Sequence, residues 1–208
     1  MGSSIDRLSF VKERVAILAE DIGSESFLNV RDESSAYDYG FTDVPALKSK
    51  SFRIGIYLTD IKVVATAENK ESAIGLLNNI VTLLKSVKVS GRSILFYEDM
   101  KKEVEGGESL RQFAGRIDNA IFTEIGEPAY VRLGQWCEGG RIAAVKRTKR
   151  FYNIDDIRVF IERLEKERLP EGVLKSLNEI ENVVKAGVYT EGHFKALENE
   201  YENLISLF

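Results

Sequence analysis

Apolar residues recur every three or four positions near both ends of the chain, which is the spacing of one face of an α-helix. Leu8, Val11, Val15, Leu18 and Ile22 follow this spacing and predict a helix over residues 5–22. The same pattern predicts further helices, and glycine or proline separates those near the C-terminus. These further helices cover residues 70–87, 154–169, 171–186 and 191–207.

Other segments have the pattern of strands. Phe52, Ile54, Ile56 and Leu58 alternate with more polar residues, which predicts a long strand over residues 52–64. Short apolar runs predict strands over residues 27–31 and 93–97, and the segments 130–137 and 141–148 are typical of two strands of a hairpin. The expected fold class is therefore α+β.

The order of these elements predicts that the chain is organised in two regions. Residues 1–105 form an α/β core, and residues 106–208 add the hairpin and a helical extension, packed with the core as one domain or separate from it. The charged stretch 98–108, which contains Gly106 and Gly107, is the expected linker. Ser109 and Gln112 have the spacing of a capping box, which predicts a helix over residues 109–125. We expect no internal repeat.

The composition limits the class of protein. Hydrophobic residues make up 44% of the 208 residues and charged residues 30%, enough for a large core with a formal net charge of −4. No apolar run approaches the roughly 18 residues that a membrane span needs, and no signal peptide is evident, so an intracellular, cytoplasmic protein is expected. The single cysteine, Cys137, and the single histidine, His193, exclude a disulfide framework and a zinc site built from several of these residues.

Basic residues are concentrated in one segment. Residues 141–150 contain no acidic residue and are followed by Phe151 and Tyr152, which is typical of a surface that contacts phosphates and stacks on bases. An equally supported alternative is a solvated hairpin whose positive charges pair with the acidic C-terminal helices. The basic residues of this segment are Arg141, Lys146, Arg147, Lys149 and Arg150.

The first hundred residues contain a carboxylate pattern that suggests catalysis. Asp43 follows a polar loop, and Asp60 and Lys62 lie two positions apart in the expected strand, where they share one face. Two adjacent carboxylates can bind one Mg²⁺ or Mn²⁺ ion, and a neighbouring lysine can position the attacking water. The chain contains no glycine-rich phosphate loop, dinucleotide-binding motif or serine nucleophile elbow.

This element order, with these residues, resembles the PD-(D/E)XK nuclease superfamily, especially archaeal Holliday-junction resolvases and related viral nucleases. The resemblance covers residues 1–97. Two departures are that Pro45 follows Asp43 instead of preceding it, and that an aspartate stands where glutamate is more common. The matching positions are Glu13-Arg14, Val30-Arg31, Ser34-Ser35, Asp43 and Asp60-Ile61-Lys62.

The resemblance implies a restriction-endonuclease-like α-β-β-β-α-β core and a Mg²⁺-dependent deoxyribonuclease that acts on branched DNA. Asp43 and Asp60 would bind the metal, with Lys62 and Glu13 as further catalytic residues. Contacts to DNA would come from Arg31, Ser34, Ser35 and the basic segment 141–150.

The alternative is a non-catalytic interaction module of a virus or mobile element, which binds protein or nucleic acid. Residues 52–87 resemble the N-terminal, non-ATPase region of archaeal conjugation-type translocases. A homodimer is expected in either case through an apolar stripe near the C-terminus, whose members are Phe194, Leu197, Tyr201, Leu204, Ile205 and Phe208.

Overall fold

The computed structural model describes residues 8–22, 44–87, 89–113, 117, 125, 128–167 and 169–208. Within these residues the chain forms eight α-helices and no strand. The helices are α1 (Phe10–Ile22), α2 (Ala46–Thr66), α3 (Lys70–Ser86), α4 (Gly91–Glu105), α5 (Pro128–Val145), α6 (Ile154–Leu164), α7 (Glu171–Lys185) and α8 (Glu191–Ser206).

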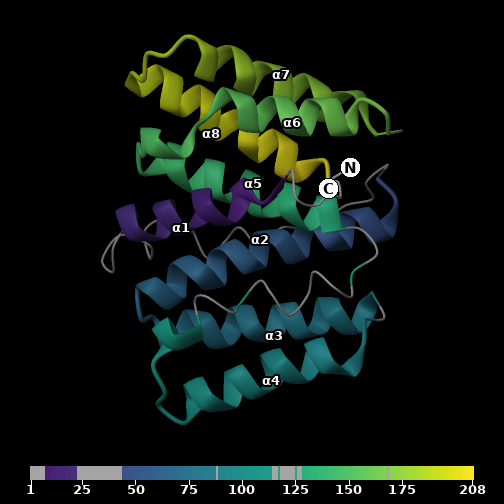
Figure 1. The fold of residues 1–208 in the computed structure, drawn as a ribbon, viewed down its shortest axis with the longest axis vertical. Helices are drawn as coiled ribbons and strands as arrows, with labels where there is room; N and C mark the ends of the chain where they lie inside the picture. Colours follow the sequence, from purple (N-terminus) through teal and green to yellow (C-terminus); the bar gives the residue numbers. More distant parts are fainter. Residues whose placement is uncertain are drawn as a thin grey trace.

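The helices stack in layers, with α2 and α5 in the middle (Figure 1). On one side of this pair, α3 packs along α2 and α4 packs along α3; on the other side, α8 packs along α5 and α7 packs along both α8 and α6. Helix α1 lies across α2 and α5, so the two central helices have neighbours on several sides. None of the described helices is long and apolar enough to cross a membrane.

The α+β prediction, with its restriction-endonuclease-like core, is wrong. Residues 52–64 lie inside α2 and residues 93–97 lie inside α4, while the two expected hairpin strands are parts of the single helix α5. The expected linker 98–108 begins inside α4, which continues to Glu105. The predicted strand 27–31 lies outside the described residues.

Burial of α2 and α5 on all sides explains this error. Every residue from Tyr130 to Ala144 in α5 is buried, and in α2 the buried residues include Phe52, Ile54, Ile56 and Leu58. A helix that is apolar all round has no polar face, so its sequence loses the periodicity of an amphipathic helix. A continuous apolar segment rich in β-branched residues then has the pattern of a buried strand.

The amphipathic helices were predicted correctly. Helices α3, α6, α7 and α8, and the described part of α1, lie where the three-and-four spacing places them. The leucines and isoleucine expected in the interior of the C-terminal helices are all buried: Leu164, Leu177, Ile180, Leu197 and Leu204. The helix expected over 109–125 begins with a 3-10 turn, Leu110–Phe113, and most of its remaining residues lie outside the described part.

The chain contains an internal repeat, contrary to expectation. The first unit is the helix pair α3 and α4, and the second unit, about 100 residues later, is the pair α7 and α8. The buried positions of α3 recur in α7: Ala73, Leu76, Leu77, Ile80 and Leu84 in the first, Val173, Ser176, Leu177, Ile180 and Val184 in the second. Residue types recur as well, because Glu71, Leu77, Asn78, Ile80 and Lys85 are matched by Glu171, Leu177, Asn178, Ile180 and Lys185. The second helix of each unit begins after an equivalent N-cap, Ser90 in α4 and Thr190 in α8.

Left-handed residues follow four of the helices. Glu68, just after α2, and Arg147, just after α5, have positive φ angles of 56° and 57°. Gly107 follows α4 and Gly187 follows α7, again with positive φ angles, of 99° and 68°. The two units differ in packing, because α3 packs along α2 in the first unit whereas α8 packs along α5 in the second.

Candidate binding surfaces

Asp60 and Lys62 do not share a face, because they lie on a helix and not on a strand. Residues two positions apart on an α-helix point in nearly opposite directions. Asp60 is fully buried inside the bundle, and Lys62 is half-buried. The strand geometry that favoured a shared metal site is therefore absent.

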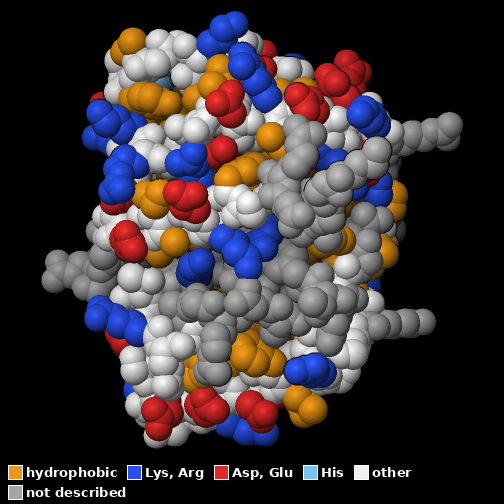
Figure 2. Space-filling model, in the orientation of Figure 1, with side chains coloured by type: hydrophobic (Ala, Val, Ile, Leu, Met, Phe, Trp, Pro, Cys, Tyr) orange, Lys and Arg blue, Asp and Glu red, His pale blue; other side chains and the backbone are white. Residues whose placement is uncertain are grey.

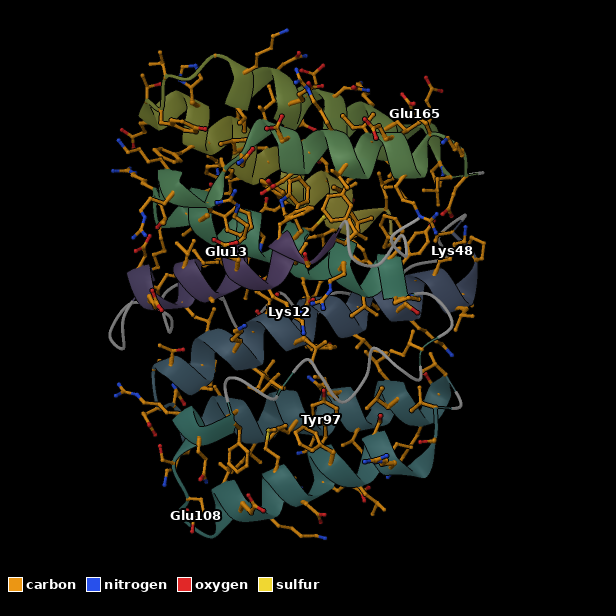
Figure 3. The ribbon with its side chains drawn as sticks, viewed as in Figure 1. Lys12, Glu13, Lys48, Tyr97, Glu108 and Glu165 are labelled. Carbon is orange, nitrogen blue, oxygen red and sulfur yellow. The ribbon has the colours of Figure 1, made fainter. Side chains whose placement is uncertain are left out.

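The other residues expected in the nuclease site are only partly described. Asp43, Arg31, Ser34 and Ser35 lie outside the described residues. Glu13 is exposed on α1, and its place on that helix can be followed in Figure 3. Within the described part of the chain, no group of three or more histidine, cysteine, aspartate or glutamate side chains is arranged to hold a metal ion.

Arg141, the first residue of the basic segment, is buried and forms an ion pair inside α5. Its guanidinium donates two hydrogen bonds to the Glu138 carboxylate, from Nη2 to Oε1 at 2.6 Å and from Nε to Oε2 at 3.0 Å. Glu138 is fully buried, and the side chain of Arg141 is 8% exposed. This pair belongs to the core of the protein, so Arg141 is not a surface contact for nucleic acid.

Two further residues of the basic segment pair with acidic residues at the surface. Arg147 contacts Glu191 of α8 at 2.7 Å, and Arg150 contacts Asp21 of α1 at 2.8 Å. Lys149 is exposed and Lys146 is half-buried. The contact between Arg147 and Glu191 agrees with the alternative expectation that these charges pair with the acidic C-terminal helices.

The apolar stripe of α8 faces the interior. Phe194, Leu197, Tyr201, Leu204 and Ile205 are all buried against the rest of the chain. Beyond the helix, the Phe208 ring stacks on Phe52 of α2 with ring centres 4.2 Å apart. The stripe is thus part of the monomer's core and is not a free surface for a second subunit.

Cys137 and His193, the only residues of their kinds, do not form a catalytic pair. Burial and the charge of Glu138 raise the pKa of the Cys137 thiol well above its usual value, which keeps it protonated. His193 lies in the first turn of α8, where its Nδ1 is 2.7 Å from the Thr190 hydroxyl. Its position at this helix end is explained by capping.

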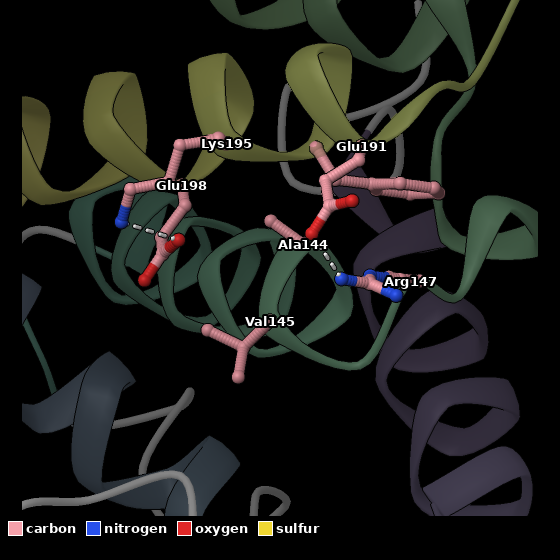
Figure 4. Close-up of a pocket in the computed structure, with 7 residues that line it drawn as sticks. Ala144, Val145, Arg147, Glu191, Lys195 and Glu198 are labelled. Atoms are coloured by element: carbon pink, nitrogen blue, oxygen red, sulfur yellow. Dashed lines mark hydrogen bonds and ion pairs between the residues drawn. The ribbon is translucent and has the colours of Figure 1, made fainter.

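A small cleft lies between the end of α5 and the first two turns of α8 (Figure 4). It has a volume of about 200 Å³. Two ion pairs border it: Arg147 with Glu191, and Lys195 with Glu198 at 2.9 Å. Apolar side chains supply the rest of its lining, namely Ala144, Val145 and Phe194.

Local structure positions the charged residues of this cleft. Arg147 has a left-handed backbone conformation, which ends α5 and turns the chain away from it. Thr190 caps α8 by accepting a hydrogen bond from the backbone of His193, and the His193 ring accepts one from the backbone of Thr190. Glu191, Lys195 and Glu198 then follow at spacings of four and three, so they share one face of the helix.

Sequence reasoning predicted that Arg147 contacts DNA, which stays a prediction, and it missed the partners of Arg147 on α8. The signal was present, because Glu191, Lys195 and Glu198 have the spacing of one helix face, but it is a common pattern on solvated helices. No model of a known protein family matches the chain, and no curated protein or solved structure is detectably similar to it.

Proposed function

We propose that the protein is a non-catalytic interaction module that binds a polypeptide segment in the cleft between α5 and α8. The observation that carries the proposal is the lining of the cleft, with two ion pairs beside an apolar floor. Such a lining fits a segment in which an acidic and a basic side chain flank an apolar one. The proposal develops the alternative of an interaction module that the sequence supports.

The exposed ion pair between Arg147 and Glu191 is easy to exchange for contacts with a partner. The side chains of Arg147 and Glu191 are 62% and 81% exposed, and such surface pairs contribute about 1 kcal/mol or less. A partner carboxylate can replace Glu191 on the planar Arg147 guanidinium, which favours bidentate contacts. Glu191 is then available to a basic side chain, while the half-buried Val145 contacts an apolar one.

Site-specific photocrosslinking in cells that produce the protein tests this function. A photoreactive amino acid at Val145, in the cleft, should give crosslinked adducts of higher mass that nuclease leaves unchanged. The same amino acid at Glu179, exposed on α7, is the control and should give none. Arg147→Glu combined with Lys195→Glu should abolish the adducts at position 145, because it removes both cations of the cleft.

Two outcomes would count against the proposal. Adducts that are unchanged by the charge reversals would place the contact elsewhere, and adducts that nuclease removes would identify a nucleic acid as the partner. A parallel assay with branched DNA and Mg²⁺ addresses the nuclease hypothesis. We expect no cleavage, because Asp60 is buried and does not share a helix face with Lys62.

A further inference from the structure

Helix α4 forms one edge of the molecule. It packs along α3, and within the described residues no other helix makes an extensive contact with it (Figure 1). Its outer side carries Leu95, which is 55% exposed although it lies in the second turn of a regular helix. Acidic, basic and hydrophobic side chains lie next to one another along this edge in Figure 2.

The internal repeat shows that folding does not require an apolar residue at this position. Helix α8 corresponds to α4 in the second unit, and the residue that corresponds to Leu95 is Lys195, whose side chain is 63% exposed. The second unit thus forms the same helix with a charged side chain towards water. Leu95 is therefore available for a contact outside the monomer.

The charges around Leu95 are self-complementary. Arg92 lies about one turn before Leu95 and Asp99 about one turn after it, and all three side chains are exposed on the same stripe. Asp99 contacts Lys102 of its own helix at 3.1 Å, and because both side chains are mostly exposed this pair is weak. An antiparallel second copy of α4 would place each Arg92 opposite Asp99 of the other copy, with the two Leu95 side chains between them.

We propose that α4 is a homodimerisation surface, on which two copies of the chain pair their α4 helices in antiparallel orientation across a two-fold axis. Each contact then occurs twice, as in other two-fold interfaces. One helix pair buries less area than the roughly 1,200–2,000 Å² of a stable interface, so the association is weak and depends on protein concentration. This surface is separate from the cleft between α5 and α8, and neither proposal depends on the other.

Sedimentation velocity of the full chain over a wide range of concentration tests the surface. The natural sequence should shift from monomer to dimer as the concentration rises. Leu95→Lys, which copies the residue of the second unit, should remain monomeric. Val188→Lys is the control, because Val188 is equally exposed but lies between α7 and α8, and it should dimerise like the natural sequence.

Charge reversal tests the antiparallel register. Arg92→Asp alone and Asp99→Arg alone should each weaken self-association by about tenfold or more, because each places like charges opposite one another twice. An equal mixture of these two variants should recover dimers, since every pair in the mixed dimer then joins opposite charges. A far-ultraviolet circular dichroism spectrum identical to that of the natural sequence confirms that each variant is folded.

The outcomes are distinguishable. A natural sequence that stays monomeric at every concentration overturns the proposal. Self-association that Leu95→Lys leaves unchanged shows that copies meet through another surface, and failure of the mixture to recover dimers overturns the antiparallel arrangement.

Discussion

Gly55 of α2 and Gly134 of α5 hold the backbones of the two central helices in direct contact. A Cβ atom on Gly55 would lie well inside van der Waals contact of the Val131 backbone oxygen. A Cβ atom on Gly134 would meet the Phe52 backbone oxygen in the same way. The relation is reciprocal, because each glycine contacts the residue three positions before the other.

Alanine at either glycine should destabilise the protein strongly. Gly55→Ala or Gly134→Ala forces α2 and α5 apart along a contact where the obstacle is rigid backbone. We expect the free energy of unfolding to fall by about 3 kcal/mol for each variant, the upper part of the range for overpacked cores. Urea denaturation followed by circular dichroism measures this change.

Gly75 provides a matched control for these variants. It lies inside α3, where a Cβ atom would meet no other atom within 4 Å. Gly75→Ala should therefore raise the stability by up to about 1 kcal/mol, because alanine favours a helix over glycine. Destabilisation at Gly75 equal to that at Gly55 would show that close packing is not the cause.

The start of α8 depends on its cap. Thr190→Ala removes the hydroxyl that accepts a hydrogen bond from the His193 backbone, and we expect a loss of about 1 kcal/mol in stability. Hydrogen exchange should become faster in the first turn of α8, where Glu191 borders the cleft. Thr190→Ser retains the capping hydroxyl and should keep the exchange slow. Fast exchange in both variants would show that this hydroxyl does not stabilise the start of α8.

The fold was predictable where helices have two different faces. In α6, Ile157, Phe160 and Leu164 face the core while charged residues face water, so the spacing alone located the helix. The central helices have no such contrast. In α5 even Arg132 and Gln135 are buried, joined by a hydrogen bond of 2.7 Å that sequence periodicity does not predict.

The repeat could have been predicted from the sequence, because Leu77, Ile80 and Lys85 recur as Leu177, Ile180 and Lys185. It was missed because a spacing of three and four is common to all amphipathic helices and does not by itself distinguish a repeat. The structure shows the repeat through identical sets of buried positions in α3 and α7.

The strand geometry expected for Asp60 and Lys62 was wrong for a related reason. Whether Asp60 and Lys62 lie on the same face depends on the backbone conformation of the segment that contains them. On a strand the two charged side chains would converge, but on α2 they diverge and Asp60 is buried. The prediction of Asp43 as a metal ligand concerns a residue outside the described part and stays a prediction.

The ionisation of Glu167 should make the free energy of unfolding depend on pH. Burial raises its pKa, but hydrogen bonds from Lys48 and Tyr130 and the charges of Lys48 and Arg163 together lower that pKa below its usual value. The carboxylate thus stabilises the folded state above the pKa of an unfolded glutamate, about 4.3, and this contribution is lost as the pH falls below that value.

Glu167→Gln tests this dependence. The variant should be less stable than the natural sequence at neutral pH and nearly equal to it at the lowest pH at which both are folded. Urea titrations at several pH values measure the difference between the two proteins. A difference that stays constant across these pH values would show that ionisation of Glu167 does not contribute.

The ion pair between Glu138 and Arg141 should be costly to break and much less costly to replace. Arg141→Met leaves the fully buried Glu138 carboxylate without this cation, and we expect a loss of about 3–5 kcal/mol in the free energy of unfolding. Adding Glu138→Gln removes the buried charge, so the double variant should regain most of the lost stability. Urea denaturation of Arg141→Met, Glu138→Gln and the double variant gives the coupling energy between the two residues. A double variant as unstable as Arg141→Met alone would show that the packing of the long arginine side chain, and not its charge, stabilises the centre of α5.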